Sequence, residues 1–509
     1  MPYAGGARYV QDKACLPGTR ETIIQEICDI LNNPDEDSPR ICLLTGVAGS
    51  GKSAVAHSIA RLYDEQQRLG SSYCFLRSDI AGRNPQNFFS TIARNLSDHD
   101  PQYKFELWQV VKDNVSLRMS TSISEQVQRL IIEPGKHLHT IGPLIIVVDA
   151  LDECGDQASR RDFLRVFAEQ VAENHLPSNL RFLVTARPES DILAALPPGP
   201  HIVHKQMADI PQDVVDGDIK KFVHYSLRAE YTELEATWPN QQWSRLLVHH
   251  SQRLFQWAST ACKFIMGDGA VGLNIRERFS VLVQKGNNVG IHPLDELYRT
   301  ILGQLFTLSN ARDKFREVMA VVLALKEPLS LTSLSALFDN DPRIRDIIKP
   351  LGSLLDGVLD EQKPIRPLHT SFRDFLLDDA RSSIFHVNLL PRHSLHLGRA
   401  LLGSMRTMLR FNICDLEDSR LRNAAVPNLT GRVAKAIPPH LAYACQYWMD
   451  HLQDVDRPSE LLDEVALFFK NFFPFWLEAI SLLAHSSPVL YTVAALKACN
   501  ILEHWAKVR

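Results

Sequence analysis

Residues 46–53 read Gly46-Val47-Ala48-Gly49-Ser50-Gly51-Lys52-Ser53, which fits the pattern G-x-x-x-x-G-K-[ST] of a phosphate-binding loop. Glycines let backbone N–H groups turn inward around an anion, because they carry no Cβ atom that would clash. The helix that follows such a loop points the positive end of its dipole at the phosphates. In this pattern Lys52 adds a point charge, and the hydroxyl of Ser53 can ligate Mg²⁺.

The segments on both sides of the loop fit this interpretation. Residues 41–44 are a short apolar run typical of a buried strand, and Ala54 begins a pattern that predicts a helix over residues 54–69. The alternative is a plain glycine turn between a strand and a helix. A chance match to the motif in a chain of this length is an event on the order of a few per cent, so we expect Gly46 to Ala54 to bind a nucleotide.

Composition bounds the class of protein. The 509 residues are too many for one hydrophobic core, so roughly two to four domains are expected. A net charge of −4 gives no electrostatic case for nucleic acid as the main partner. Nine scattered cysteines, with no C-x-x-C pair, argue against a zinc ribbon or a disulfide framework and fit a reducing, cytoplasmic compartment. The longest apolar stretches, such as residues 318–325, fall well short of a membrane span of about 20 residues, so no membrane span is expected.

Helical and strand-like patterns alternate over residues 38–210, which we predict to be an α/β P-loop NTPase domain. Continuous apolar strands that alternate with helices indicate a parallel sheet with helices on both faces. The strands are expected at residues 41–44, 72–76, 144–148, 180–185 and 201–205.

The remaining residues are mostly helical in pattern. We predict an N-terminal arm and helix at residues 1–37, a helical domain at 211–290 that ends in a linker at 286–293, and an all-α C-terminal region at 384–509. Residues 291–383 hold three helices and a hairpin formed by residues 358–359 and 365–368, an order typical of a winged-helix domain.

Acidic residues follow the apolar run 144–148. Asp149 closes that run, and an acid at the carboxyl end of a buried strand points into the crevice where α/β sheets bind ligands. This place suits an acid that holds Mg²⁺, directly or through water. Asp152 or Glu153 is then positioned to orient or deprotonate an attacking water, although both residues also suit a solvated loop.

Arg187 closes a second strand, at the end of Val184-Thr185-Ala186-Arg187-Pro188. A cation at this edge of the sheet can contact the γ-phosphate and so distinguish a triphosphate from a diphosphate. The alternative is an ordinary surface arginine at the end of a strand.

The segments just described, together with several others, resemble the NACHT class of STAND nucleotide switches, most closely the fungal NACHT proteins. The core of these proteins is related to that of the animal NOD-like receptors. The matching segments are CLPGTR at 15–20, the loop at 46–53, VVDALDEC at 147–154, VTARP at 184–188, LFQWASTACKFI at 254–265, LDELYRTIL at 294–302, LHTSFRDFLLD at 368–378 and HLAYACQYWMDHL at 440–452.

The resemblance implies a role for each matching residue. Lys52 would bind the β- and γ-phosphates, Ser53 and Asp149 would hold magnesium, and Arg187 would sense the γ-phosphate. Either Asp152 or Glu153 would activate water. His369, a lone histidine without other support, matches the winged-helix histidine that contacts the β-phosphate of ADP, and Arg20 would lie near the adenine.

The resemblance also implies a function, which is an ATP/ADP-dependent signalling switch. Such a switch binds Mg-nucleotide, hydrolyses it slowly and forms a homo-oligomer when it opens. A catalytically weak scaffold that regulates related NACHT proteins by co-assembly is the alternative. A DNA-binding winged helix is less favoured, because Arg343, Arg345 and Lys349 are interspersed with acids. A small-molecule kinase is also less favoured, because the sequence shows neither a lid nor a substrate pocket.

Overall fold

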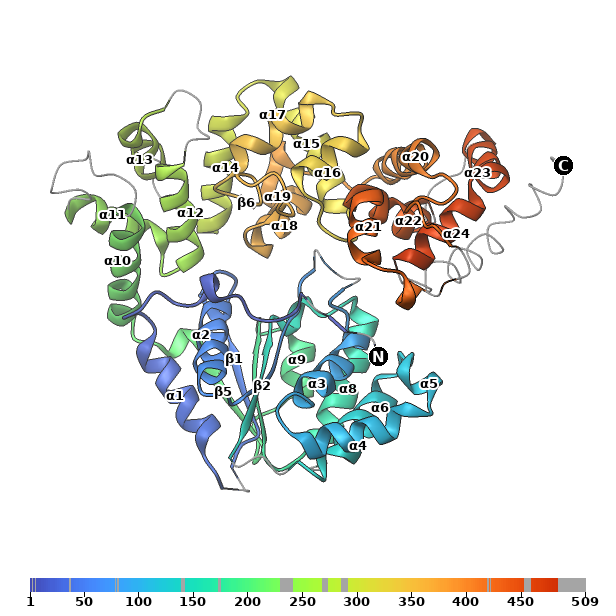
Figure 1. The fold of residues 1–509 in the computed structure, drawn as a ribbon. Coiled ribbons are helices and arrows are strands. Elements are labelled where there is room, and N and C mark those ends of the chain that lie inside the picture. Colours follow the sequence, from blue (N-terminus) through green and yellow to red (C-terminus); the bar gives the residue numbers. More distant parts are fainter. Residues whose placement is uncertain are drawn as a thin grey trace. The chain divides into compact units, whose positions relative to one another are not determined.

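The computed structural model describes residues 1–483, except for residues 2, 5, 36–37, 78, 80–81, 139–141, 173–174, 229–240, 268–272, 285–291, 419–420, 422 and 453–458. Most of the predicted linker at 286–293 lies outside the described residues. The chain separates into two compact units, which Figure 1 draws in sequence colours. The first unit comprises Met1–Met266, Asn274–Leu297 and His369–Ser371, and the second comprises Gly267–Leu273, Tyr298–Leu368 and Phe372–Arg509.

The first unit is built on a five-stranded parallel sheet with the strand order β2-β3-β4-β1-β5 (Figure 1). The strands are β1 (Ile41–Thr45), β2 (Leu69–Cys74), β3 (Leu144–Asp149), β4 (Leu180–Ala186) and β5 (Ile202–Gln206). Every residue of β1 to β4 is buried, which explains the nearly continuous apolar sequences of β1 and β3. The predicted α/β architecture with a parallel sheet is therefore confirmed.

Helices cover both faces of this sheet. Alternate strand residues enter two separate cores because successive side chains of a strand point to opposite faces. Leu44 packs in one core with helices α1 (Glu21–Asn32) and α2 (Lys52–Glu65). Leu43 packs in the other core with α3 (Phe88–Leu96) and α8 (Gln157–Ala172).

The further helices of the first unit surround the sheet or follow it in the chain. They are α4 (Pro101–Lys112), α5 (Val115–Arg118), α6 (Ile123–Gln126), α7 (Glu133–Gly135), α9 (Ser190–Ala195), α10 (Gln212–Arg228), α11 (Gln241–Ser251), α12 (Phe255–Met266) and α13 (Ile275–Gln284). Helix α14 (Pro293–Leu305) begins in this unit and continues into the second.

Helix α2 is shorter than its sequence predicts, because the expected helix over 54–69 ends at Glu65. Gln67 adopts a left-handed conformation with φ of 57°, and the N–H of Arg68 donates to the carbonyl of Tyr63 at 2.8 Å. This arrangement closes the helix, so Leu69 begins β2 instead of continuing the apolar stripe.

The second unit is largely helical. Its elements are α15 (Ser309–Ala324), α16 (Leu331–Leu337), α17 (Pro342–Ile348), β6 (Leu355–Asp356), β7 (Arg366–Pro367), α18 (Thr370–Leu377), α19 (Asp379–Ser382), α20 (Pro391–Met408), α21 (Leu429–Ala436), α22 (Pro439–Leu452), α23 (Ser459–Asn471) and α24 (Phe473–Leu482). Residues 370–371 at the start of α18 group with the first unit.

The predicted hairpin exists, but its first strand lies earlier than residues 358–359. Leu355 pairs with Pro367 in an antiparallel bridge between β6 and β7. Gly357 has φ of +79°, and a Cβ atom there would lie 2.5 Å from the carbonyl oxygen of Pro364. The turn therefore starts at Gly357, and Leu359 is 96 % exposed in it.

The aromatic residues of the C-terminal helices form a core. Phe468, Trp448 and Trp476 are fully buried, and the indole N–H of Trp476 donates to the carbonyl of Cys445 at 2.9 Å. Among the described residues, no single helix is long and apolar enough to span a membrane. Only the segments Leu461–Asn471 and Phe473–Leu482, which are bent by 72°, reach that length and apolarity when they are counted together.

Candidate functional site

The predicted site residues converge on the edge of the sheet where the parallel strands end. The register pairs Thr45 of β1 with Ala186 of β4, and Cys74 of β2 with Asp149 of β3. The glycine-rich loop leaves β1 at this edge, and Arg187 directly follows β4. Because ligands of α/β sheets bind beyond the carboxyl ends of the strands, this edge is the candidate functional site.

The loop itself tolerates only glycine at critical points. Gly49 and Gly51 have φ of 81° and 100°. A Cβ atom on Gly49 would lie 2.9 Å from Cβ of Gln256, and one on Gly46 would lie 2.9 Å from Cβ of Met207. The loop is thus held close against neighbouring segments in a conformation that side chains would prevent.

Lys52 directly follows the glycines of this loop and is the first residue of α2. Its Nζ atom donates to the carbonyl oxygens of Gly46 at 2.7 Å and of Val47 at 3.0 Å. Burial lowers the pKa of the Lys52 ammonium, and the nearby carboxylates of Asp152 and Asp149 oppose that shift. The side chain is therefore a largely desolvated cation, whose attraction to an anion is stronger than in water.

Arg20 packs directly against the loop. Its Nη2 atom donates to the carbonyl oxygen of Ser50 at 3.0 Å, and its guanidinium lies 4.7 Å from the ring centroid of Phe255. The side chain is buried, and within the described part of the chain its Nε and Nη1 atoms have no hydrogen-bond partner. Two buried donors without acceptors are costly, so this corner of the site fits a ligand with acceptor atoms.

Asp149 is fixed by a residue that the sequence did not single out. The hydroxyl of Thr185 on β4 donates to Oδ1 of Asp149 at 2.6 Å, and the backbone N–H of Ala150 donates to the same hydroxyl oxygen at 3.0 Å. All of β4 is buried, so Thr185 is a polar residue in a buried and mostly apolar strand. A polar residue within a predicted buried strand was the signal in the sequence for a hydrogen bond of this kind.

Asp152 and Glu153 differ sharply in their partners. Both oxygens of Asp152 contact Arg187, which donates from its backbone N–H at 3.0 Å and from Nε at 3.1 Å. Glu153 accepts the backbone N–H of Arg77 at 3.1 Å and also a hydrogen bond from the side chain of Thr370. Burial first, and the charge of Asp152 second, raise the pKa of Glu153 to about 7, although bonds from Arg77 and Thr370 oppose the rise.

His369 adjoins a residue that contacts Arg187. Residues 369–371 group with the first unit, and within it Nη2 of Arg187 donates to the hydroxyl of Thr370 at 3.3 Å. Nδ1 of His369 accepts the backbone N–H of Ser371 at 3.1 Å. In the neutral ring the proton is therefore on Nε2, which makes that atom a donor.

The chain's residues fit a nucleotide with Mg²⁺. The glycine-lined loop, the desolvated ammonium of Lys52 and the unpartnered nitrogens of Arg20 are groups that accept an anion and a polar base. Ser53, which is exposed at the first turn of α2, and Asp149 offer the oxygen ligands that Mg²⁺ prefers.

Comparisons with known proteins match the part of the chain that carries this site. The family described as Nephrocystin 3, N-terminal, matches residues 18–187, which is the segment from just before Arg20 to Arg187. The vegetative incompatibility protein HET-E-1 of Podospora anserina is 24 % identical over 268 residues. This match covers 47 % of the present chain but only 18 % of HET-E-1, so the chain matches less than a fifth of that relative. A Walker-type ATPase of Pyrococcus abyssi covers 69 % of this chain, and 93 % of its own length is matched, with 14 % identity and a TM-score of 0.32, a likeness too loose to assign a fold.

The motifs, the sheet and the sequence matches together define a nucleotide-binding P-loop NTPase. More narrowly, the sequence matches support a fungal NACHT-like P-loop NTPase, because the chain is similar to part of HET-E-1. This confirms the resemblance inferred from the sequence motifs. The roles of the individual site residues stay predictions.

Proposed function

We propose that the protein is an ATP/ADP-dependent switch of the STAND class, in which the bound nucleotide controls opening and self-assembly. The observation that carries this proposal is the environment of Arg187. Asp152 accepts hydrogen bonds from the backbone N–H and the guanidinium of Arg187. The hydroxyl of Thr370, next to His369, accepts a hydrogen bond from Nη2 of the same arginine. A cation in that position can contact a γ-phosphate and is also connected to the segment that carries the proposed ADP contact.

The residues around the loop bind and orient the nucleotide in this proposal. Lys52 binds the β- and γ-phosphates, and residues 46–51 surround them with backbone N–H groups. Ser53 and Asp149 hold Mg²⁺, which when bound neutralises phosphate charge. The two unpartnered nitrogens of Arg20 donate hydrogen bonds to acceptor atoms of the base.

Glu153 is the proposed water-activating group, and Asp152 positions Arg187. A general base is most effective when its pKa lies near the working pH, and the pKa of Glu153 is raised to about 7. Asp152 is the weaker candidate because both of its oxygens already contact Arg187. These contacts favour Glu153 over Asp152, which the sequence left as alternatives.

His369 is the proposed contact with the β-phosphate of ADP. Its Nδ1 atom accepts the N–H of Ser371 and lies 2.7 Å from the hydroxyl of that residue, so in the neutral ring the proton is on Nε2. In this proposal Nε2 donates that proton in a hydrogen bond to a phosphate oxygen. A change from a mostly closed to a mostly open population needs about 5.5 kcal/mol of differential binding. A few hydrogen bonds to charged groups, at about 1.5–3 kcal/mol each, supply an amount of that size.

We further propose the domain division predicted from sequence, with a helical domain at 211–290, a winged helix at 291–383 and a helical region at 384–509. The order of α14 to α17 followed by the β6–β7 hairpin supports the winged-helix assignment. A cytoplasmic location and a homo-oligomeric open state belong to the same proposal.

DNA binding by this segment is not favoured. Arg343 pairs with Asp341, while Arg345 and Lys349 both pair with Glu361. Neutralised basic side chains have little to offer to a phosphate backbone.

A catalytically weak scaffold that co-assembles with related proteins is the second candidate. The observation that favours it is the burial of Glu153, one oxygen of which already accepts the N–H of Arg77. An enzyme whose general base is this enclosed would hydrolyse nucleotide slowly or not at all.

Nucleotide binding and turnover by Lys52→Ala test the proposal. Loss of the buried ammonium should weaken ATP binding at least tenfold, because a hydrogen bond to a charged group contributes about 1.5–3 kcal/mol. Isothermal titration with ATP and Mg²⁺ measures the affinity, and phosphate release measures turnover. Undiminished ATP affinity in the variant would end the proposal, whereas tight binding without turnover in the wild type would favour the scaffold.

A further inference from the structure

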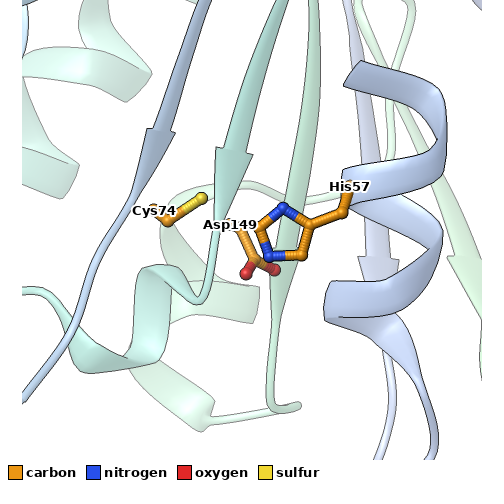
Figure 2. Close-up of side chains that lie close together, drawn as sticks. All are labelled: His57, Cys74 and Asp149. Carbon is orange, nitrogen blue, oxygen red and sulfur yellow. The ribbon is translucent and has the colours of Figure 1, made fainter. Parts of the chain in front are cut away.

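Three side chains with metal-ligating atoms meet behind the phosphate-binding loop (Figure 2). They are His57 on α2, Cys74 at the end of β2 and Asp149 at the end of β3. All three are buried, and one ligand atom from each lies within 4.8 Å of the other two. The cluster therefore brings a nitrogen, a sulfur and an oxygen donor to one point.

Within the described structure, no hydrogen bond or ion pair joins these three side chains to one another. His57 accepts the backbone N–H of Val10 at its Nδ1 atom, at 3.2 Å, so in the neutral ring without metal the proton is on Nε2. Figure 2 shows the ring edge of His57 turned toward the Asp149 carboxylate, with Cys74 on the other side of that carboxylate. Thr185 bonds Oδ1 of Asp149, which leaves Oδ2 for another partner.

The geometry points to a binding site for a borderline-soft divalent cation of the Zn²⁺ class, formed by His57, Cys74 and Asp149. Imidazole, thiolate and carboxylate are the donors that zinc uses in proteins, and three protein ligands leave one position for water. Donor atoms around a tetrahedral zinc lie roughly 3.3–3.8 Å apart, so the longest separation must shorten by about 1 Å. Binding replaces the proton of the Cys74 thiol, which is released to solvent.

One supporting contact is of the kind that orients ligands in known metal sites, because the Thr185 hydroxyl fixes the Asp149 carboxylate. A metal ion at Nε2 of His57 moves the ring proton to Nδ1, so its binding replaces the contact between Nδ1 and the Val10 N–H. The sequence could not predict this cluster, because its members are far apart in the chain and match no ligand spacing.

The site differs from the proposed Mg²⁺ site but shares Asp149 with it. Ser53 lies one helical turn before His57, so the two sites adjoin along α2. Magnesium prefers oxygen ligands, and a thiol–imidazole pair selects against it. If the proposed function holds, zinc occupancy and magnesium binding at Asp149 exclude each other.

Cobalt titration of the chelator-treated full chain, without nucleotide, tests the site. Co²⁺ is the spectroscopic probe, because cobalt bound to thiolate gives a charge-transfer band in the near ultraviolet. We expect that band to saturate at one Co²⁺ per chain, to persist in excess Mg²⁺ and to disappear when Zn²⁺ is added. Cys74→Ala should abolish the band, and His57→Gln should lower the Co²⁺ affinity at least about tenfold.

Cys42→Ala is the matched control, because Cys42 is a fully buried strand cysteine outside the cluster. It should keep the band unchanged. Thermal melts without metal establish that each variant is folded, and His57→Gln tests the site independently if Cys74→Ala does not fold. The inference is wrong if the wild type shows no thiolate band, or if the band survives in folded Cys74→Ala. Because no nucleotide is present, neither result depends on the proposed switch.

Discussion

The carboxyl group of Glu153 is buried beside Asp152, which raises its pKa to about 7. The unfolded chain gives this group its ordinary pKa near 4.5, so the protonated form is favoured by folding. The resulting stabilisation is fully present below pH 4.5 and is lost as the pH rises through about 7. The same group should become a competent base as it loses its proton, so turnover should increase as the pH rises through about 7.

Glu153→Gln separates these two effects. The amide keeps the shape of the side chain but cannot be charged or accept a proton, so turnover should fall at least a hundredfold while ATP still binds. Its melting temperature should exceed that of the wild type above pH 7, because the cost of a buried charge is removed. Calorimetry across pH 5–8 and phosphate-release assays measure both quantities. Asp156→Asn, at an exposed neighbour, should leave turnover unchanged, and full turnover in Glu153→Gln would remove Glu153 from the mechanism.

Asp152 and Arg187 should behave as one unit. If Asp152 acts by holding Arg187, then Asp152→Ala and Arg187→Ala should reduce the preference for ATP over ADP by a similar factor, about tenfold. The double variant should lose no more of this preference than either single variant, because the effects of mutations within one network are not additive. Affinities for ATP and ADP in this cycle give the coupling, and strictly additive losses would contradict the positioning role.

At the scale of elements, the phosphate-binding loop is the segment whose backbone conformation is most constrained. Gly49→Ala should weaken nucleotide binding, because φ of +81° disfavours any side chain and the Cβ atom would lie 2.9 Å from Gln256. Gly217→Ala is the matched control in α10, where a Cβ atom meets nothing within 4 Å. It should raise stability by about 0.5–1 kcal/mol. Denaturant melts and ATP titrations distinguish the two, and normal ATP affinity in Gly49→Ala would show that the loop adapts.

Elements set by local sequence were predicted well. The loop, the strands ending at Asp149 and Ala186, and the order of helices and hairpin all follow from patterns within a few residues. The boundaries that failed depend on backbone turns, since Gln67 ends α2 and Gly357 starts the hairpin turn.

The site could be predicted only in part for a similar reason. The sequence named Asp149 and Arg187, but it could not separate Asp152 from Glu153, because the choice depends on Arg187 and on burial. It missed Thr185 and the contact of Arg20 with Ser50, which join segments far apart in the chain.

For the whole molecule, residues 369–371 are the connection between nucleotide and conformation in the proposed switch. These residues belong to the first unit, whereas the chain before and after them belongs to the second. A nucleotide contact at His369 would therefore act on a short segment that is flanked in the chain by residues of the second unit. In the proposed switch, this contact would be one that differs between the two states.

The dissociation rate of a fluorescent ADP analogue, followed by stopped-flow displacement with excess ADP, tests this claim most directly. The measurement compares the wild type with His369→Ala, and with His386→Ala as a histidine control outside the site. The account predicts that His369→Ala releases ADP about tenfold faster or more, as expected for the loss of one hydrogen bond to a charged group, while His386→Ala matches the wild type. An unchanged rate in His369→Ala would contradict the switch and leave a nucleotide-binding NTPase without this control.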